Sequence, residues 1–206
     1  MSLDTYDNLK KEIINWSHRD DVDLMIPTFI QIAEMEMFAN PVEVLEVRGQ
    51  EIRLETVTSG QYLDLPAGFQ SMRAIRFLIP QDYGSVKYRA PGQMVYQPAT
   101  GRPNFFTVAS QIEFDRVPDS DYDIEIHYFA KPAALSDANQ VNEVLTDNPN
   151  IYLYGALWSL YGYANDEIQQ QKYGDMFLAA IKGANKLYKK GRYGSSPAMT
   201  PAGSTP

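Results

Sequence analysis

The chain has 206 residues, enough to bury a sizeable core in one domain or in two small ones. Hydrophobic residues make up 44% of it and charged residues 21%, as in an ordinary folded globular protein. The lack of cysteine excludes disulfides, thiol catalysis and cysteine-based zinc sites. Only two histidines are present, so candidates for a general base or a metal ligand are few.

The net charge of −8 argues against a protein that grips nucleic acid through its phosphates. This charge is unevenly distributed, because no acidic residue follows Asp175 and residues 1–175 carry −13. The basic residues beyond that point are Lys182, Lys186, Lys189, Lys190 and Arg192. A basic end on an acidic chain suggests an arm that docks to another protein.

The N-terminal stretch MSLDTYDNLKKEI lacks the apolar core of a signal peptide. No apolar run approaches the length that spans a bilayer. We therefore expect a soluble protein, made in the cytoplasm, that does not contact membranes.

Two helices are expected before residue 42. Thr5 is the expected N-cap of the first, whose apolar stripe consists of Tyr6, Leu9, Ile13 and Trp16. The motif SHRDD ends this helix. The second runs from about Pro27 to about Phe38, and its apolar stripe consists of Phe29, Ile30, Ala33 and Met37.

From Val42 to about Lys131 the hydrophobic period changes to two. The runs that predict strands are VEVLEVR, EIRLETV, SMRAIRF, SVKYRA, FFTVA, QIEFDRV and YDIEIHYFA. In the last run, alternation places Ile124, Ile126 and Tyr128 on one face and Asp123, Glu125 and His127 on the other. Residues 42–131 are therefore expected to form an inserted antiparallel β-domain, either a sandwich or a small barrel.

Helical signals then return. Asn148 as cap and Pro149 as first residue predict a helix over Ile151 to Tyr163, and its apolar character on all sides predicts burial. A further helix is expected from about Asp166 to Lys190. The residues expected to be critical for the core are Trp16, Phe29, Tyr154, Leu157, Trp158 and Phe177.

Together these elements predict an α+β fold. Its helical bundle would combine residues 1–41 with residues 132–193, on either side of the β-domain. Residues 194–206 are small, polar and proline-rich, which predicts an extended C-terminal arm rather than an independently folded segment.

Motifs for catalysis or metal binding are scarce. SHRDD places Ser, His and Asp side by side, but neighbours in one turn rarely form a catalytic triad, and Arg19 is expected to pair with Asp20, Asp21 or Asp23. DRVPDSDYDIE holds five acidic residues but lacks the glycine and glutamate of a calcium-binding EF-hand, so we expect a hairpin loop with solvated carboxylates. The sequence predicts no catalytic, cofactor or metal site and no enzyme.

Several fragments occur here in a characteristic order: YDNLKKEIINWSHRDD, MIPTFIQIAEMEM, YLDLPAGFQSMRAIRF, GRPNFFTV, IHYFAKPAALSD and VLTDNPNIYLYGAL. Over roughly residues 5–190 the chain resembles the head-to-tail adaptor (connector) proteins of short-tailed bacteriophages, akin to tail tubular protein A. Gly68 and the pair Ser17–His18 depart from the usual pattern of these proteins.

The resemblance implies a structural protein of the virion neck. It implies a homo-dodecamer ring beneath the capsid portal protein, joined to the tail nozzle protein, through which double-stranded DNA passes without specific binding. A C-terminal arm would reach the portal. The residues expected to dock are Lys182, Lys186, Lys189, Lys190, Arg192, Tyr193, Pro197 and Met199. The alternative is a carbohydrate- or receptor-binding module of the tail that uses Tyr and Trp side chains of the β-domain, and an enzyme comes third.

Overall fold

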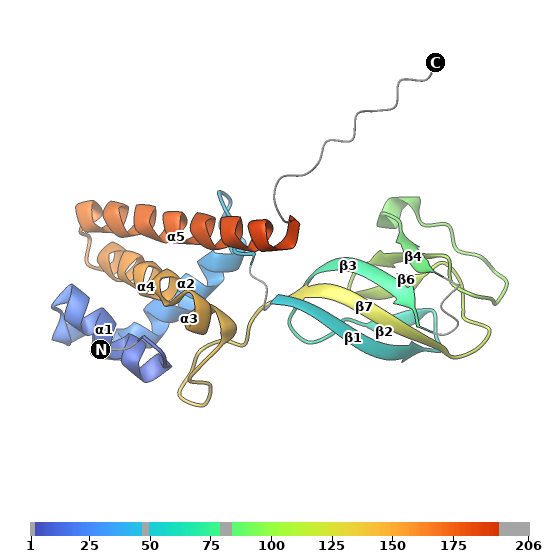
Figure 1. Cartoon of the computed structure of the whole chain (residues 1–206), viewed down its shortest axis with the longest axis horizontal. Coiled ribbons are helices and arrows are strands. Elements are labelled where there is room, and N and C mark those ends of the chain that lie inside the picture. Colours follow the sequence, from blue (N-terminus) through green and yellow to red (C-terminus); the bar gives the residue numbers. More distant parts are fainter. Residues whose placement is uncertain (1–2, 47–49, 79–83, 194–206) are drawn as a thin grey trace, which may run out of the picture. The chain divides into compact units, whose positions relative to one another are not determined.

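A computed structural model describes residues 3–46, 50–78 and 84–193. Of residues 192 and 193 it describes the backbone alone. The chain divides into two compact units (Figure 1). The helical unit comprises Met1–Arg48 and Ala133–Pro206, and the β unit comprises Gly49–Pro132. The fold is therefore mixed α+β, as the sequence predicts.

The helical unit contains five α-helices and one 3-10 helix among its described residues. The α-helices are α1 (Tyr6–Ser17), α2 (Ile26–Ala39), α3 (Glu143–Asp147), α4 (Pro149–Tyr163) and α5 (Glu167–Tyr193), and the 3-10 helix η1 is Asp20–Met25. Helix α4 contacts α1, α2, α3 and α5, so it is the central element of this unit.

The first helix begins and ends as its sequence predicts. The Thr5 hydroxyl accepts a hydrogen bond from the Asn8 backbone N–H at 3.2 Å, which satisfies one of the free donors at the helix start. At the other end, His18 adopts a left-handed conformation with φ 52°, and its N–H bonds to the Ile14 carbonyl. SHRDD is thus a helix end and a turn.

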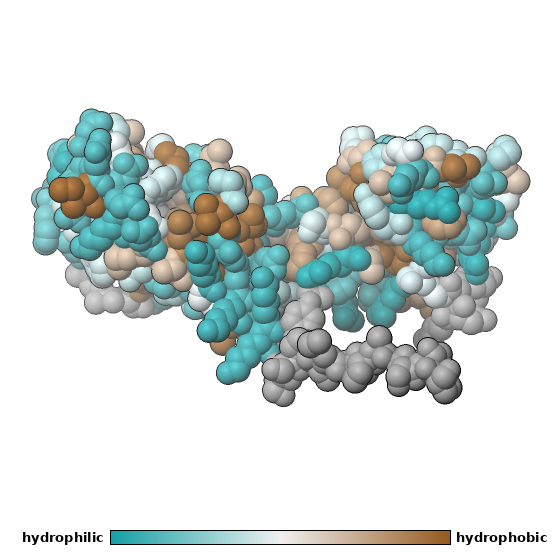
Figure 2. All heavy atoms as spheres, turned by 90° about the horizontal axis from the view of Figure 1, so that it is seen from above, coloured by the Kyte–Doolittle hydropathy of each residue, from teal (hydrophilic) through white to brown (hydrophobic). Residues whose placement is uncertain are grey.

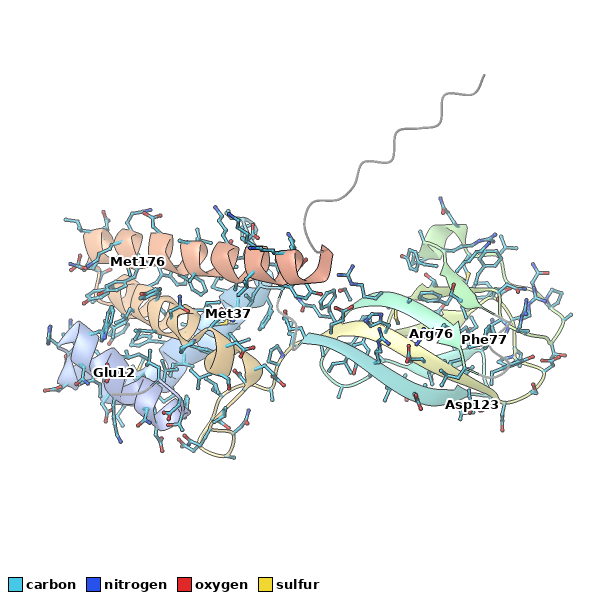
Figure 3. The ribbon with its side chains drawn as sticks, in the orientation of Figure 1. Glu12, Met37, Arg76, Phe77, Asp123 and Met176 are labelled. Atoms are coloured by element: carbon cyan, nitrogen blue, oxygen red, sulfur yellow. The ribbon has the colours of Figure 1, made fainter. Side chains whose placement is uncertain are left out.

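The core of the helical unit is built from facing sides of α1, α2, α4 and α5. Phe29, Leu157 and Phe177 are buried there, as the sequence predicts. Tyr154 and Trp158 are half-buried and pack against this core. In Figure 3, Met37 marks the α2 contribution and Met176 the α5 contribution.

The prediction that Trp16 is a core residue is wrong. Its side chain is 42% exposed, because it lies in the last turn of α1 and packs against Tyr154 from the outside, with ring centroids 6.1 Å apart. Helical spacing correctly placed it on the apolar side of α1. The buried side of α1 continues from Ile13 to Ser17, which is 7% exposed, so Trp16 lies at the edge of that side.

The β unit is one curved seven-stranded sheet with the order β1-β7-β3-β4-β5-β6-β2. The strands are β1 (Glu51–Thr58), β2 (Tyr62–Asp64), β3 (Phe69–Phe77), β4 (Ser85–Tyr88), β5 (Phe105–Val108), β6 (Gln111–Phe114) and β7 (Tyr122–Ala130), with a short 3-10 helix η4 (Pro91–Gln93). The two edge strands, β1 and β2, follow one another in the chain. The sheet therefore curls around its own core as a nearly closed barrel.

Two details of the β prediction are corrected. The β4–β5 pair is parallel, with Lys87 opposite Phe105, so the sheet is not wholly antiparallel. Residues 42–46 of the run VEVLEVR form no strand, and the rest of that run lies outside the described residues. Strand β2 was not predicted, since three residues are too few to show a period.

Alternation along β7 is confirmed. Ile124, Ile126 and Tyr128 are buried in the barrel core. On the opposite face, the Glu125 carboxylate pairs with the Arg76 guanidinium at 2.8 Å. The neighbouring residue on β3, Phe77, faces the core instead, and Figure 3 labels both.

Candidate docking surfaces

The motifs tested for chemistry have structural roles. Arg19 forms a two-pronged ion pair with Asp21, with N–O distances of 2.6 and 2.7 Å, and thereby shapes the turn after α1. This confirms the pairing expected within SHRDD. The Asp21 carboxylate is exposed, and its hydrogen bonds from Arg19 hold its pKa below the ordinary value.

The acidic stretch DRVPDSDYDIE differs from its prediction at two residues, Asp115 and Glu125; Glu125 is 8% exposed and pairs with Arg76. Asp115 is only 2% exposed, whereas the sequence predicted solvated carboxylates throughout. Its Oδ1 accepts hydrogen bonds from the backbone N–H groups of Asn104 and Phe105, at 2.8 and 3.1 Å, and its Oδ2 pairs with Arg116. This carboxylate therefore ties the GRPNFF turn to the end of β6.

In the part of the chain that the structure describes, no group of three or more His, Asp or Glu side chains is placed to hold a metal ion. No helix there combines the length and apolar character needed to cross a membrane. What the described residues do offer is a set of surfaces and anchoring contacts, and those that bear on docking lie in the helical unit.

The basic end of α5 is an exposed surface. Lys182, Lys186, Lys189 and Lys190 are all exposed, and their three- and four-residue spacings place them on one side of the helix. Among residues 3–46, 50–78 and 84–193, no ion pair involves any of these four lysines. Exposed Leu187, with 71% of its surface accessible, lies beside them.

The structure describes less of the remaining residues that are expected to dock. Arg192 and Tyr193 belong to the last turn of α5 by their backbone, and their side chains lie outside the described residues. Pro197 and Met199 also lie outside the described residues.

The opposite end of α5 is acidic. Asp166 caps it, because its carboxylate accepts a hydrogen bond from the Gln169 N–H at 3.1 Å, and Glu167 occupies the first turn. Acidic residues at a helix start and basic residues at its end both interact favourably with the helix dipole. Helix α5 is therefore charged oppositely at its two ends, along a length of about 40 Å.

A groove of about 570 Å³ lies between the first half of α5 and the C-terminal end of α2. Its floor includes the stacked rings of Trp158 and Phe177, whose centroids are 6.5 Å apart. Its other lining residues are Glu36, Asn40, Glu167, Gln170, Gln171, Gly174, Asp175 and Leu178. Three carboxylates thus border an aromatic floor, and sequence spacing could not have shown this because the lining comes from three helices.

Seen from above, where α5 lies uppermost in Figure 1, the helical unit shows hydrophobic patches set among mainly hydrophilic atoms (Figure 2). The exposed apolar residues of α5, Ile168 and Leu187, are 81% and 71% accessible. Apolar side chains this exposed are individually normal on a monomer.

A buried polar cluster anchors the chain where it returns from the β unit. The Tyr152 hydroxyl donates to Glu34 at 2.9 Å and accepts from the Asn142 amide at 2.7 Å. Glu34 also accepts from the Leu135 N–H, and Asn142 also donates to the Ala133 carbonyl. We call Glu34, Asn142 and Tyr152 the return anchor. It explains the motif KPAAL, whose backbone is held by this cluster.

Burial affects the acid–base properties of the return anchor. It raises the pKa of the Glu34 carboxyl, and the hydrogen bonds from Leu135 and Tyr152 oppose that rise only in part. The pKa of the Tyr152 hydroxyl is also raised, first by burial and then by the nearby Glu34 carboxylate. The Tyr152 hydroxyl therefore keeps its proton and remains a hydrogen-bond donor.

The outgoing segment has an anchor of its own. Asn185 of α5, only 3% exposed, accepts from the Glu46 N–H at 2.7 Å and donates to the Glu43 carboxylate and the Val44 carbonyl. Leu45 is buried in the core of the helical unit. These contacts explain why residues 43–46 pack on the helices rather than forming the predicted strand.

The surfaces and anchors formed by the described residues contain no recognisable reaction centre, so comparison with known proteins decides the class. A family model described as SU10 adaptor protein matches residues 4–202. The chain belongs to this family. The SU10 adaptor match confirms the resemblance to phage adaptor proteins, and a structural adaptor family is not a class of enzymes. No curated protein matches the chain significantly.

Proposed function

We propose that this SU10 adaptor family member is a structural component of the virion neck. It would form a homo-dodecamer ring that joins the capsid portal protein to the tail nozzle protein and lets double-stranded DNA pass. The match to the adaptor family over residues 4–202 carries this proposal.

The charge distribution supports it. A net charge of −8 suits a protein that surrounds moving DNA without retaining it, because fixed negative charges repel phosphates. The exposed lysines of α5 have no acidic partner within the described part of the chain, so they are available to a second protein. We assign docking to the portal to this basic end together with the C-terminal residues, including Arg192, Tyr193, Pro197 and Met199.

The test compares the full chain with a chain truncated after Arg192, each mixed with portal rings of the same phage. Co-sedimentation and electron microscopy measure attachment, and circular dichroism checks that the shortened chain is folded. Removal of the terminal segment should weaken attachment and leave the helical content unchanged. Equal attachment by both chains would contradict the docking role of this segment.

A charge-reversal pair tests the lysines separately. Lys189→Glu with Lys190→Glu should weaken attachment, and the loss should be smaller at high salt, where the wild-type contact is already screened. Lys11→Glu is the matched control, because Lys11 is an exposed lysine of α1 at a distance in sequence from the basic end. An equal loss with Lys11→Glu would show a general effect of net charge.

A further inference from the structure

The acid-bordered groove beside Trp158 is the described surface best suited to a partner of defined chemistry. Its carboxylates come from Glu36, Glu167 and Asp175. Glu36 accepts a long hydrogen bond from the Asn40 amide at 3.4 Å. Asp175 accepts a hydrogen bond from the Gln171 amide at 3.0 Å. No lysine, arginine or histidine of the described chain forms an ion pair with these three carboxylates. The groove therefore favours a positively charged occupant.

The aromatic residues of the groove also limit the kind of group that can bind there. Trp158 is half-buried, so part of its indole is available at the groove, and a tryptophan face attracts ammonium and guanidinium groups. Phosphate groups are disfavoured, because three carboxylates border the same groove. The groove is therefore best suited to bind a segment that carries lysine side chains and an apolar side chain.

The same chain carries such a segment at the other end of α5. Lys182 and Lys186 are one turn apart on its exposed side, and Leu187, the residue after Lys186, has 71% of its surface accessible. Its charges and its apolar side chain complement the groove. Helix α5 spans both surfaces, so one copy cannot bring its own straight helix end into its own groove.

We propose that the groove of one copy receives the basic segment Lys182–Leu187 of a second copy. A contact between two different surfaces of identical chains is the kind that closes into a ring when the rotation between copies permits. This proposal rests on the proposed function for its biological setting. It also divides the basic end: Lys182 and Lys186 serve the neighbouring copy, while the residues beyond them remain for the portal.

Disulfide trapping tests the contact, because the chain has no cysteine of its own. Gln171→Cys marks the groove and Leu187→Cys marks the basic segment, each in an otherwise full-length chain. Mixed in equal amounts under mild oxidation, the two variants should form a mixed disulfide dimer. Leu24→Cys is the matched control, since Leu24 is a leucine of the same unit and is 92% exposed.

Charge reversal establishes whether the attraction is electrostatic. Asp175→Lys in the groove variant should lower the trapping rate about fivefold, as expected for loss of a favourable exposed charge pair. Lys186→Glu in the other variant should lower it similarly, and combining the two reversals should restore it. The proposal would be overturned if Leu24→Cys were trapped as fast as Leu187→Cys. It would also be overturned if neither charge reversal changed the trapping rate.

The outcomes separate this inference from the proposed function. Asp175→Lys should weaken contact between copies about fivefold and still allow the chain to attach to portal rings, because the C-terminal segment is intact. Trapping without any portal attachment would leave the contact established and reject the adaptor role of the basic end. Portal attachment in rings that are unaffected by Asp175→Lys would reject the groove contact and retain the adaptor role.

Discussion

Replacement of Tyr152 by Phe removes a single hydroxyl from the return anchor. That hydroxyl is almost completely buried, in a side chain that is 1% exposed, and it makes one hydrogen bond to an amide and one to a carboxylate. A neutral hydrogen bond contributes about 1 kcal/mol, and one to a charged group about 1.5–3 kcal/mol. Asn142 keeps its bonds to the Ala133 carbonyl and the Leu145 N–H, and Glu34 keeps its bond from the Leu135 N–H, so we expect a loss of about 2–3 kcal/mol.

Urea unfolding followed by tryptophan fluorescence measures this loss. Both tryptophans of the chain, Trp16 and Trp158, belong to the helical unit, so the signal reports unfolding of that unit alone. With a urea dependence of about 1–3 kcal/mol per molar, the midpoint should fall by roughly 1–2 M.

Tyr154→Phe is the matched control. Tyr154 lies two residues away on the same helix, is half-buried and packs against Trp16 through its ring. Its hydroxyl makes no hydrogen bond to the described part of the chain, so its removal should change stability by less than about 0.5 kcal/mol. If Tyr152→Phe were as stable as wild type, or if both variants lost the same amount, the return anchor would not hold the chain as argued.

Three further outcomes are expected. Burial raises the pKa of Glu34 above its ordinary 4.5, so the folded state keeps a proton that the unfolded chain loses, and this contribution to stability falls as pH rises from about 4.5 through the raised pKa. Glu34→Gln should therefore gain stability relative to wild type across that interval in urea titrations. Gly155→Ala should cost about 1–3 kcal/mol, because an added Cβ would lie 2.8 Å from the Ala33 Cβ, whereas Gly183→Ala meets nothing within 4 Å and should add up to about 1 kcal/mol in thermal melts. Trp158→Ala should destabilise the helical unit by about 3 kcal/mol in calorimetry, and exposed Trp16→Ala by much less; equal losses would contradict this difference in burial.

Local signals in the sequence predicted α1, α2, α4 and α5, but not the five-residue helix α3. Thr5 predicts the start of α1 because its hydroxyl can cap the helix. Pro149 predicts the start of α4 because its backbone angle φ is already helical. Asn148 occupies the cap position of α4, although its side chain makes no capping hydrogen bond. The period of two along β7 likewise predicted which side chains enter the barrel core.

What the sequence could not reveal depends on contacts between distant residues. The run VEVLEVR has the period of a strand, yet Asn185, some 140 positions later, binds its backbone and directs Leu45 into the helical core. Trp16 has helical spacing, yet its position relative to Tyr154 exposes it. In both cases tertiary contacts overrode a correct local pattern.

The groove shows the same limit at the level of function. Net charge revealed an acidic body and a basic end, but composition does not show where acidic side chains gather. Folding brings Glu36 of α2 beside Glu167 and Asp175 of α5, at the opposite end of the helix that carries the lysines. Because the two ends of α5 carry opposite charges, each copy has one acidic and one basic surface. Such a subunit can meet the next copy through unlike surfaces, whereas a uniformly acidic subunit would repel it.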